Sequence, residues 1–184
     1  HAEPIGDKML MAQLYNNLAV VGQMTGQIDA ALENNQKSLQ LKEQLGDAVG
    51  MANSYINLGL IYSIMGEYDR ALEYYQQAAT IAKRTGAQDR VADAESRMGT
   101  LYWGQEDYDR AAAHYLTSLE IHQKIGNATG VATAYINLVG ASLGKNDLES
   151  AGTYATQGLE AAQQIGVAQV IAAAYNNITI LQLH

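Results

Sequence analysis

The segment YINLGLIYSIMGEYDRALEYYQQA, residues 55–78, decides the fold of this chain. Its first half places Tyr55, Leu58 and Tyr62 at i, i+3 and i+7, which is the spacing of one face of an α-helix. Gly66 interrupts the pattern, and beyond it an apolar face with the same spacing resumes. The segment therefore predicts two helices joined by a tight turn.

The same pattern returns every 40 residues along the chain. Glycine, aromatic, aliphatic, alanine and acidic positions each recur at this period, which is the mark of a repeat protein. The recurring positions are Gly6, Gly46, Gly86, Gly126 and Gly166; Tyr15, Tyr55, Tyr135 and Tyr175, with Glu95 in the remaining slot; Leu18, Leu58, Met98, Leu138 and Ile178; Ala31, Ala71, Ala111 and Ala151; and Asp29, Asp69, Asp109 and Glu149. The chain is predicted to hold four repeats and the first half of a fifth.

Each repeat is predicted to be a helix–turn–helix hairpin, and because one hairpin cannot cover its own apolar face, neighbouring hairpins stack. The acidic position falls in the first turn of each second helix, where the helix dipole favours negative charge. We expect an all-α fold in which residues 1–184 form a single repeat array. The expected repeats lie near 7–46, 47–86, 87–126 and 127–166, with a half repeat at 167–184. The expected helices lie near 8–25, 28–44, 48–65, 69–85, 88–104, 108–125, 128–144, 148–165 and 168–183.

Residues 55–78 and the segment RMGTLYWGQEDYDRAAAHYLTS, residues 97–118, resemble the tetratricopeptide repeat. That family combines a first-helix aromatic, Leu-Gly and Tyr with a second-helix Ala and aromatic, at a usual period of about 34 residues. The longer period found here is similar to the repeats of Partner-of-Inscuteable/G-protein-signalling modulators and of kinesin light chains. The resemblance covers residues 7–184 and implies tetratricopeptide-type repeats stacked into a right-handed superhelical solenoid.

Small residues are predicted to mark the closest helix–helix contacts, and large ones the spaces beside them. The small positions are Gly59, Gly99, Ala71 and Ala111. Repeats one and four depart from the family pattern at positions where aromatic residues are expected. These departures are Gly22, Asn35, Ser142 and Ala155. We expect them to weaken packing locally without changing the fold.

Composition and charge exclude several classes of protein. With 48% apolar and 16% charged residues the chain is not intrinsically disordered. Its net charge of −8 repels phosphate backbones, so nucleic acid is not an expected partner. The absence of cysteine excludes a disulfide scaffold, a thiolate zinc site and a cysteine nucleophile. No apolar run is long enough to span a membrane and no basic-then-apolar leader pattern occurs, so we expect a soluble chain without membrane insertion, and a cytoplasmic one.

Catalytic and metal-binding motifs are not evident in the sequence. His114 and His122 lie two turns apart on one predicted helix, too far to share a metal ion, whereas His1 and His184 are terminal. The acidic group Glu106, Asp107 and Asp109 is typical of a capped, solvated helix start. No Gly-rich phosphate loop and no Ser/His/acid grouping occurs. We expect no enzyme activity, no metal and no cofactor.

The inner surface of a superhelix of this kind is made by the first helix of each repeat. The residues opposite the core on these helices, here called the first-helix face, are Gln13, Asn16, Asn17, Val20, Met24, Asn53, Ile56, Asn57, Leu60, Ile64, Asp93, Ser96, Arg97, Thr100, Trp103, Thr133, Ile136, Asn137, Gly140, Asn176, Asn177 and Ile180. Two subsets of this face are candidate ligand contacts: a polar column at the 40-residue period, and apolar residues beside it. The candidates are Asn17, Asn57, Arg97, Asn137 and Asn177, with Ile56, Leu60, Trp103 and Ile136.

The polar column suits a peptide ligand, because an amide carries both a hydrogen-bond donor and an acceptor. Trp103 is the strongest single candidate, since Trp is over-represented among interface hot spots. Two structural alternatives stand beside these interpretations. The amides can instead bond to neighbouring helices or water, and Trp103 can instead fill a buried contact between repeats. Arg97 is the one basic residue predicted on the face, which disfavours a receptor that clamps a C-terminal carboxylate with several basic residues.

The leading functional hypothesis is a non-enzymatic scaffold that binds a protein or peptide segment along the concave first-helix face. The alternative is a ligand-sensing or regulatory tetratricopeptide module of a larger bacterial signalling or transcription protein. The last predicted helix has no second helix to cover its outer side, and terminal repeats normally carry a polar capping face. We therefore expect the C-terminal end to pack against another copy of the chain or against a further segment.

Overall fold

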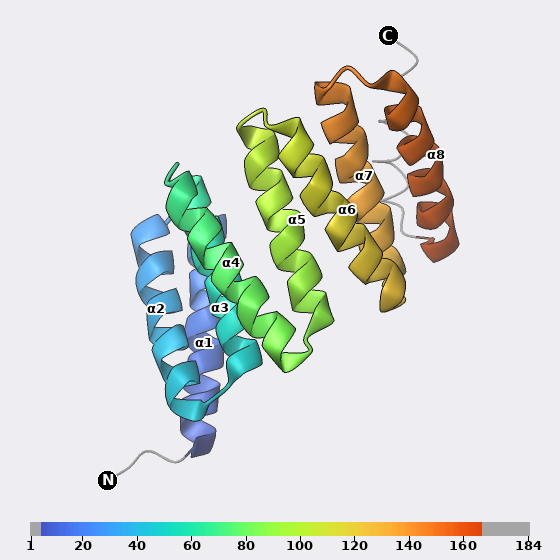
Figure 1. Ribbon diagram of the computed structural model, residues 1–184. Coiled ribbons are helices and arrows are strands. Elements are labelled where there is room, and N and C mark those ends of the chain that lie inside the picture. Colours follow the sequence, from blue (N-terminus) through green and yellow to red (C-terminus); the bar gives the residue numbers. More distant parts are fainter. Residues whose placement is uncertain (1–4, 167–184) are drawn as a thin grey trace. The chain divides into compact units, whose positions relative to one another are not determined.

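The computed structural model describes residues 5–166, and all of its regular structure in that range is α-helical. The helices are α1 (Ile5–Met24), α2 (Ile28–Leu45), α3 (Ala48–Ile64), α4 (Tyr68–Thr85), α5 (Gln88–Gly104), α6 (Tyr108–Lys124), α7 (Ala128–Gly144) and α8 (Leu148–Ile165) (Figure 1). The ends of all these helices fall within three residues of the sequence-based prediction. The predicted helix near 168–183, with Asn177 and the C-terminal packing surface, lies outside the described residues.

The chain divides into two compact units, residues 1–94 and 95–184, and the division falls inside α5. In the first unit α1 pairs with α2, α3 pairs with α4, and α2 packs against α3. In the second unit α7 pairs with α8 and packs against α6. Each unit is thus built from the predicted hairpins, stacked one on the next.

The turn inside each hairpin places one residue in the left-handed region of backbone conformation. Repeats one and two use glycine there, with φ of 74° at Gly26 and 78° at Gly66. Repeats three and four use Glu106, with φ of 61°, and Asn146, with φ of 59°. Residues other than glycine are strained in this conformation. The short side chain of asparagine can offset part of the strain by hydrogen-bonding to the local backbone, but that of glutamate does not. The hairpin of repeat three therefore carries strain at its turn.

We expect Glu106→Gly to stabilise the protein by about 0.5–1 kcal/mol, because relief of the strain outweighs the added flexibility of the unfolded chain. Urea unfolding measures the change. The converse substitution Gly66→Glu is the matched control and should lower stability by a similar amount. Unchanged transition midpoints in both variants would contradict this reading of the turn.

Helix pairing depends on complementary side-chain sizes at two positions 16 residues apart. A Cβ atom at Gly59 would overlap the ring of Tyr75, and one at Gly99 would lie 2.7 Å from Cδ1 of Tyr115. Repeat four reverses the sizes, since Val139 on α7 packs against the small Ala155 on α8. The prediction that Ala155 weakens packing is therefore wrong at this pair, because Val139 fills the space that the missing ring would leave.

Two further predictions about small residues can be compared with the structure. Ala71 and Ala111 are fully buried, as expected for close helix contacts. A Cβ atom at Gly22 would lie 3.1 Å from both Cβ and N of Ala31, so in repeat one α1 and α2 approach each other closely at a position where tyrosine stands in repeats two and three. The missing aromatic residue is thus replaced by direct contact between helices.

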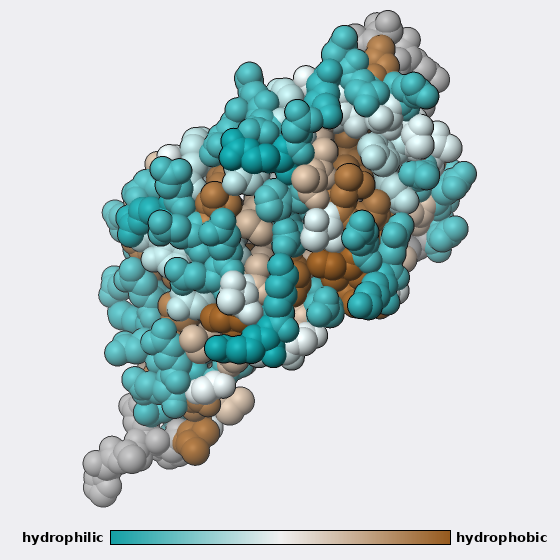
Figure 2. Space-filling model, in the orientation of Figure 1, coloured by the Kyte–Doolittle hydropathy of each residue, from teal (hydrophilic) through white to brown (hydrophobic). Residues whose placement is uncertain are grey.

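The surface is largely hydrophilic on the side that Figure 2 shows, and hydrophobic residues gather there in separate patches. On α1, however, Leu14, Leu18 and Val21 are exposed. The equivalent residues one repeat later, such as Leu58 and Ile61 on α3, are buried. Among the described residues no helix is long and apolar enough to cross a membrane.

Candidate functional site

The second unit contains a hollow of about 250 Å³ on the first-helix face. Its lining comes from α5, α6 and α7 and consists of Thr100, Trp103, Tyr115, Ile136, Asn137 and Gly140. The Trp103 side chain is 47% exposed, whereas Ile136 and Asn137 are partly buried. The sequence therefore identified three candidate residues that the structure brings together: an exposed indole, an aliphatic side chain and an amide.

Two local contacts shape this hollow. Gly140 leaves room beside the indole, since a Cβ atom at that position would lie 3.5 Å from Nε1 of Trp103. The Tyr115 hydroxyl donates to Oγ1 of Thr100 at 3.3 Å, and burial raises the pKa of this phenol above its ordinary value. The hollow thus combines mainly apolar walls with a few placed polar groups, as ligand sites usually do.

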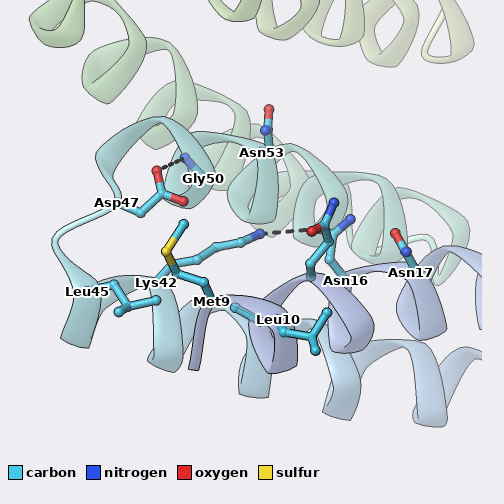
Figure 3. Close-up of a pocket in the computed structure, with 11 residues that line it drawn as sticks. Met9, Leu10, Asn16, Asn17, Lys42, Leu45, Asp47, Gly50 and Asn53 are labelled. Carbon is cyan, nitrogen blue, oxygen red and sulfur yellow. Dashed lines mark hydrogen bonds between the residues drawn. The ribbon is translucent and has the colours of Figure 1, made fainter. Parts of the chain in front are cut away.

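The first unit contains a second hollow of about 420 Å³, between α1 and α3 (Figure 3). Gln13, Asn16 and Asn17 line it from α1, and Asn53 lines it from α3. All four belong to the predicted first-helix face. Asn57 lies next to this set, because its Nδ2 donates to Oδ1 of Asn16 at 3.2 Å. The hollow between α1 and α3 is therefore lined by more polar side chains than the hollow beside Trp103.

Lys42 is the residue in this hollow that the sequence analysis missed. It belongs to the second helix of its hairpin, α2, but its side chain extends toward Asn16 (Figure 3). The residue is 7% exposed, and Nζ donates to Oγ of Ser54 at 2.8 Å and more weakly to Oδ1 of Asn16 at 3.4 Å. Burial lowers the pKa of the ammonium group, and the nearby Asp47 carboxylate opposes this shift only in part. Arg97 is therefore not the one basic residue available to the first-helix face.

The remaining candidates differ in exposure. Asn17 is exposed, whereas Leu60 and Arg97 are partly buried. Ile56 is 5% exposed, so the prediction that it contacts a ligand is not supported by its position. The alternative placement of Trp103 in a buried contact is likewise not what the structure shows, because half of the side chain is accessible.

The histidine and acidic residues have structural partners. Nδ1 of His114 lies 2.8 Å from Oε2 of the buried Glu95, and the imidazole stacks on Tyr102 with ring centroids 5.4 Å apart. The equivalent positions in repeat two hold the stacked pair Tyr55 and Tyr74. The His–Glu pair therefore occupies a packing position, and among residues 5–166 no group of three or more His, Asp or Glu could hold a metal ion.

Comparison with known proteins agrees with the architecture. The tetratricopeptide repeat model matches residues 10–84 and 90–164, while no curated protein matches the chain significantly. Aspartyl phosphate phosphatase F from Bacillus subtilis has a similar structure, with a TM-score of 0.90 at 10% identity over 98% of this chain and 46% of that one. A Rap protein complexed with competence and sporulation factor gives 0.74 at 16% identity over 89% and 46%.

A third similar structure is a signal transduction ATPase with numerous domains and a tetratricopeptide repeat sensor, from Pyrococcus horikoshii. It gives a TM-score of 0.81 at 20% identity over 97% of this chain and 28% of that one. The chain thus spans less than half the length of these three proteins. At such low identity the likeness concerns the fold. The family model covers most of the sequence, and the 40-residue hairpins fit it: the chain belongs to the tetratricopeptide repeat family.

Proposed function

We propose that this chain is a non-enzymatic interaction module that binds an extended peptide segment along its first-helix face. The observation that carries the proposal is the hollow of the second unit, where the half-exposed Trp103 lies with Ile136 and Asn137. An indole that keeps half of its surface accessible beside an aliphatic wall is a typical interface anchor. An apolar side chain of the peptide enters this hollow and covers the indole.

The amide of Asn137 gives the ligand its direction. A peptide backbone presents N–H and C=O groups, and one amide side chain can accept from the first and donate to the second. The 40-residue period offers one polar residue per repeat on this face, with Asn17 and Asn57 in the first unit and Arg97 and Asn137 in the second. Such contacts hold the backbone, while Trp103 and Ile136 select the side chain.

Family membership supports this proposal, since tetratricopeptide repeats are interaction modules. The similar Rap structure is a complex with competence and sporulation factor, which is a precedent within the same fold. The net charge of −8 disfavours a ligand that is strongly acidic along its whole length. A ligand with one acidic group at a defined position is compatible with this net charge.

A second candidate function is a sensor module of a larger signalling protein. It is favoured by the fold likeness to the ATPase with a tetratricopeptide repeat sensor, of which this chain spans 28%. In that case the ligand on the first-helix face changes a contact with an effector domain. The two functions share the binding surface and differ in whether ligand binding alters a second interaction.

A peptide-display screen on the purified chain tests the proposal, followed by titration of the selected peptide. We expect Asn137→Ala to weaken binding about tenfold, since the partner group on the peptide loses its hydrogen bond in a site with little water. Asn34→Ala on α2 is the control, because the Asn34 amide donates only to the carbonyl of Ala30 within its own helix. Wild-type affinity in the Asn137 variant, with unchanged helicity, would place the binding surface elsewhere.

A further inference from the structure

Helix α1 carries a strip of exposed apolar side chains on the face that points away from α2. The strip, here called the outer strip, consists of Leu10, Leu14, Leu18 and Val21, each between 52% and 58% exposed. Their spacing of i, i+4, i+8 and i+11 places them on one side of the helix, opposite the buried Ala19. Leu10 lies at the edge of the strip and also borders the hollow between α1 and α3. Half of the exposed large apolar side chains between residues 5 and 166 belong to α1, so the exposure is concentrated on this helix.

The equivalent face of α3 and of α7 packs against the second helix of the preceding hairpin, which is α2 or α6. Ser54 on α3 stands at the position of Leu14, and its Oγ accepts from Nζ of Lys42 on α2 at 2.8 Å. Gly130 on α7 stands at the position of Leu10, and a Cβ atom there would overlap the ring of His122 on α6. Small residues at these two positions therefore let the preceding helix approach closely.

The outer strip does not have the side-chain sizes that this packing requires. Leu14 stands where the other repeats have serine or alanine, and Leu10 stands where repeats two and four have glycine. A helix placed on α1 as α2 is placed on α3 would be held away by these two leucines, because a close-packed contact cannot take up the added volume. Aligned residues of leucine size at spacings of three and four are instead typical of the seam between two paired helices.

Charge and symmetry favour a second copy of this chain as the partner helix. Residues 9–24 of α1 include no charged side chain, so two copies can approach here although each has a net charge of −8. The outer strip is centred near residue 16, so an antiparallel pair of α1 helices brings Leu14 of one copy against Leu18 of the other. The Asp7 carboxylate then faces Thr25 of the second copy, whereas a parallel pair would bring two Asp7 carboxylates together.

We infer that two copies of this chain associate through the outer strip of α1, as an antiparallel helix pair about a two-fold axis. The contact is isologous, since each copy contributes the same residues, and such a contact closes on a dimer. It uses no residue of the hollow beside Trp103, so it goes beyond the proposed function and can be tested without a peptide ligand.

Light scattering during size-exclusion chromatography, over a wide range of protein concentration, tests the association. We expect the mass to rise with concentration from that of one chain to that of two. The double variant Leu14→Glu with Leu18→Glu should weaken dimerisation at least about a hundredfold, because the dimer would bury four carboxylates without partners. Its helicity should not change, since both leucines are half exposed in the single chain.

Ile64→Glu with Leu116→Glu is the matched control, because it adds the same two charges at exposed apolar positions outside the outer strip. This variant should dimerise like the wild type. A wild-type chain that stays monomeric at every concentration would overturn the inference and assign the strip to a helix from outside this chain. A dimer that persists unchanged in the Leu14 and Leu18 double variant would also overturn it.

Disulfide trapping tests the antiparallel geometry, because the chain has no cysteine of its own. Leu14→Cys and Leu18→Cys are purified separately and then oxidised either alone or as a mixture. We expect the mixture to form covalent dimers at least about fivefold faster than either variant alone, since only the pair from positions 14 and 18 comes within bonding distance. Equally fast trapping of each variant alone would indicate a parallel pair and overturn the proposed arrangement.

Discussion

Replacing Gly99 with valine destabilises the protein by about 2–3 kcal/mol in urea unfolding. The Cβ atom of a side chain at this position lies 2.7 Å from Cδ1 of Tyr115 and 3.2 Å from the backbone oxygen of Ala111. Neither neighbour can move freely, because Tyr115 is buried and Ala111 is part of the α6 backbone. The two helices must therefore separate, or the tyrosine must leave its pocket.

A compensating substitution at Tyr115 shows whether the loss of size complementarity between positions 99 and 115 causes the loss of stability. Tyr115→Ala alone leaves a cavity and costs about 3–5 kcal/mol. The double variant Gly99→Val with Tyr115→Ala reproduces the arrangement of Val139 and Ala155 in repeat four. We expect its loss of stability to be smaller than the sum of the two single losses by at least about 1 kcal/mol, which is typical coupling for residues in contact. Strictly additive losses would show that the pair is not complementary.

Trp103→Ala has the largest expected effect on binding, a loss of affinity of about 30-fold or more for a peptide that the chain selects. Trp103 is the most exposed apolar side chain that lines the hollow in the second unit, since Ile136 beside it is partly buried. Helicity should change little, because half of the side chain is already exposed.

Tyr68→Ala is the matched control for this substitution. Tyr68 is 45% exposed, close to the 47% of Trp103, but it lies at the start of α4 and lines neither hollow. Titration of the same peptide against both variants separates the loss of a particular contact from the loss of aromatic surface in general. Equal affinities in the two variants would contradict the role of Trp103.

The ends of the helices could be predicted closely because the same short sequence pattern recurs several times along the chain. Each glycine of the 40-residue column that follows a second helix, such as Gly46 and Gly86, adopts a left-handed conformation and ends that helix. A helix end that is misplaced in one repeat is therefore corrected by comparison with the next repeat. The effect of a departure from the pattern on packing could not be predicted in the same way. The packing around Ala155, for example, depends on the size of Val139, which lies on the other helix of the pair.

The site could be predicted in part. A helical wheel assigns a direction to each Cα–Cβ bond, and this was enough to bring Trp103, Ile136 and Asn137 together. It does not give the reach of a long side chain, so Lys42 was missed although its head lies among first-helix residues. Nor does it give the size of neighbouring groups, so Ile56 was placed on the surface although it is buried. The clue available in the sequence was the lysine itself, at a position where two other repeats have alanine.

The emission of Trp103 tests the central claim most directly, because it is the one tryptophan in the sequence and lies in the hollow where the peptide is proposed to bind. A display-selected peptide is added to saturation, which calorimetry establishes independently, and the emission spectrum and acrylamide quenching are recorded. If the peptide covers the indole, the emission maximum shifts to shorter wavelength and quenching falls. An unchanged spectrum and unchanged quenching at saturation would contradict binding at this face of the second unit.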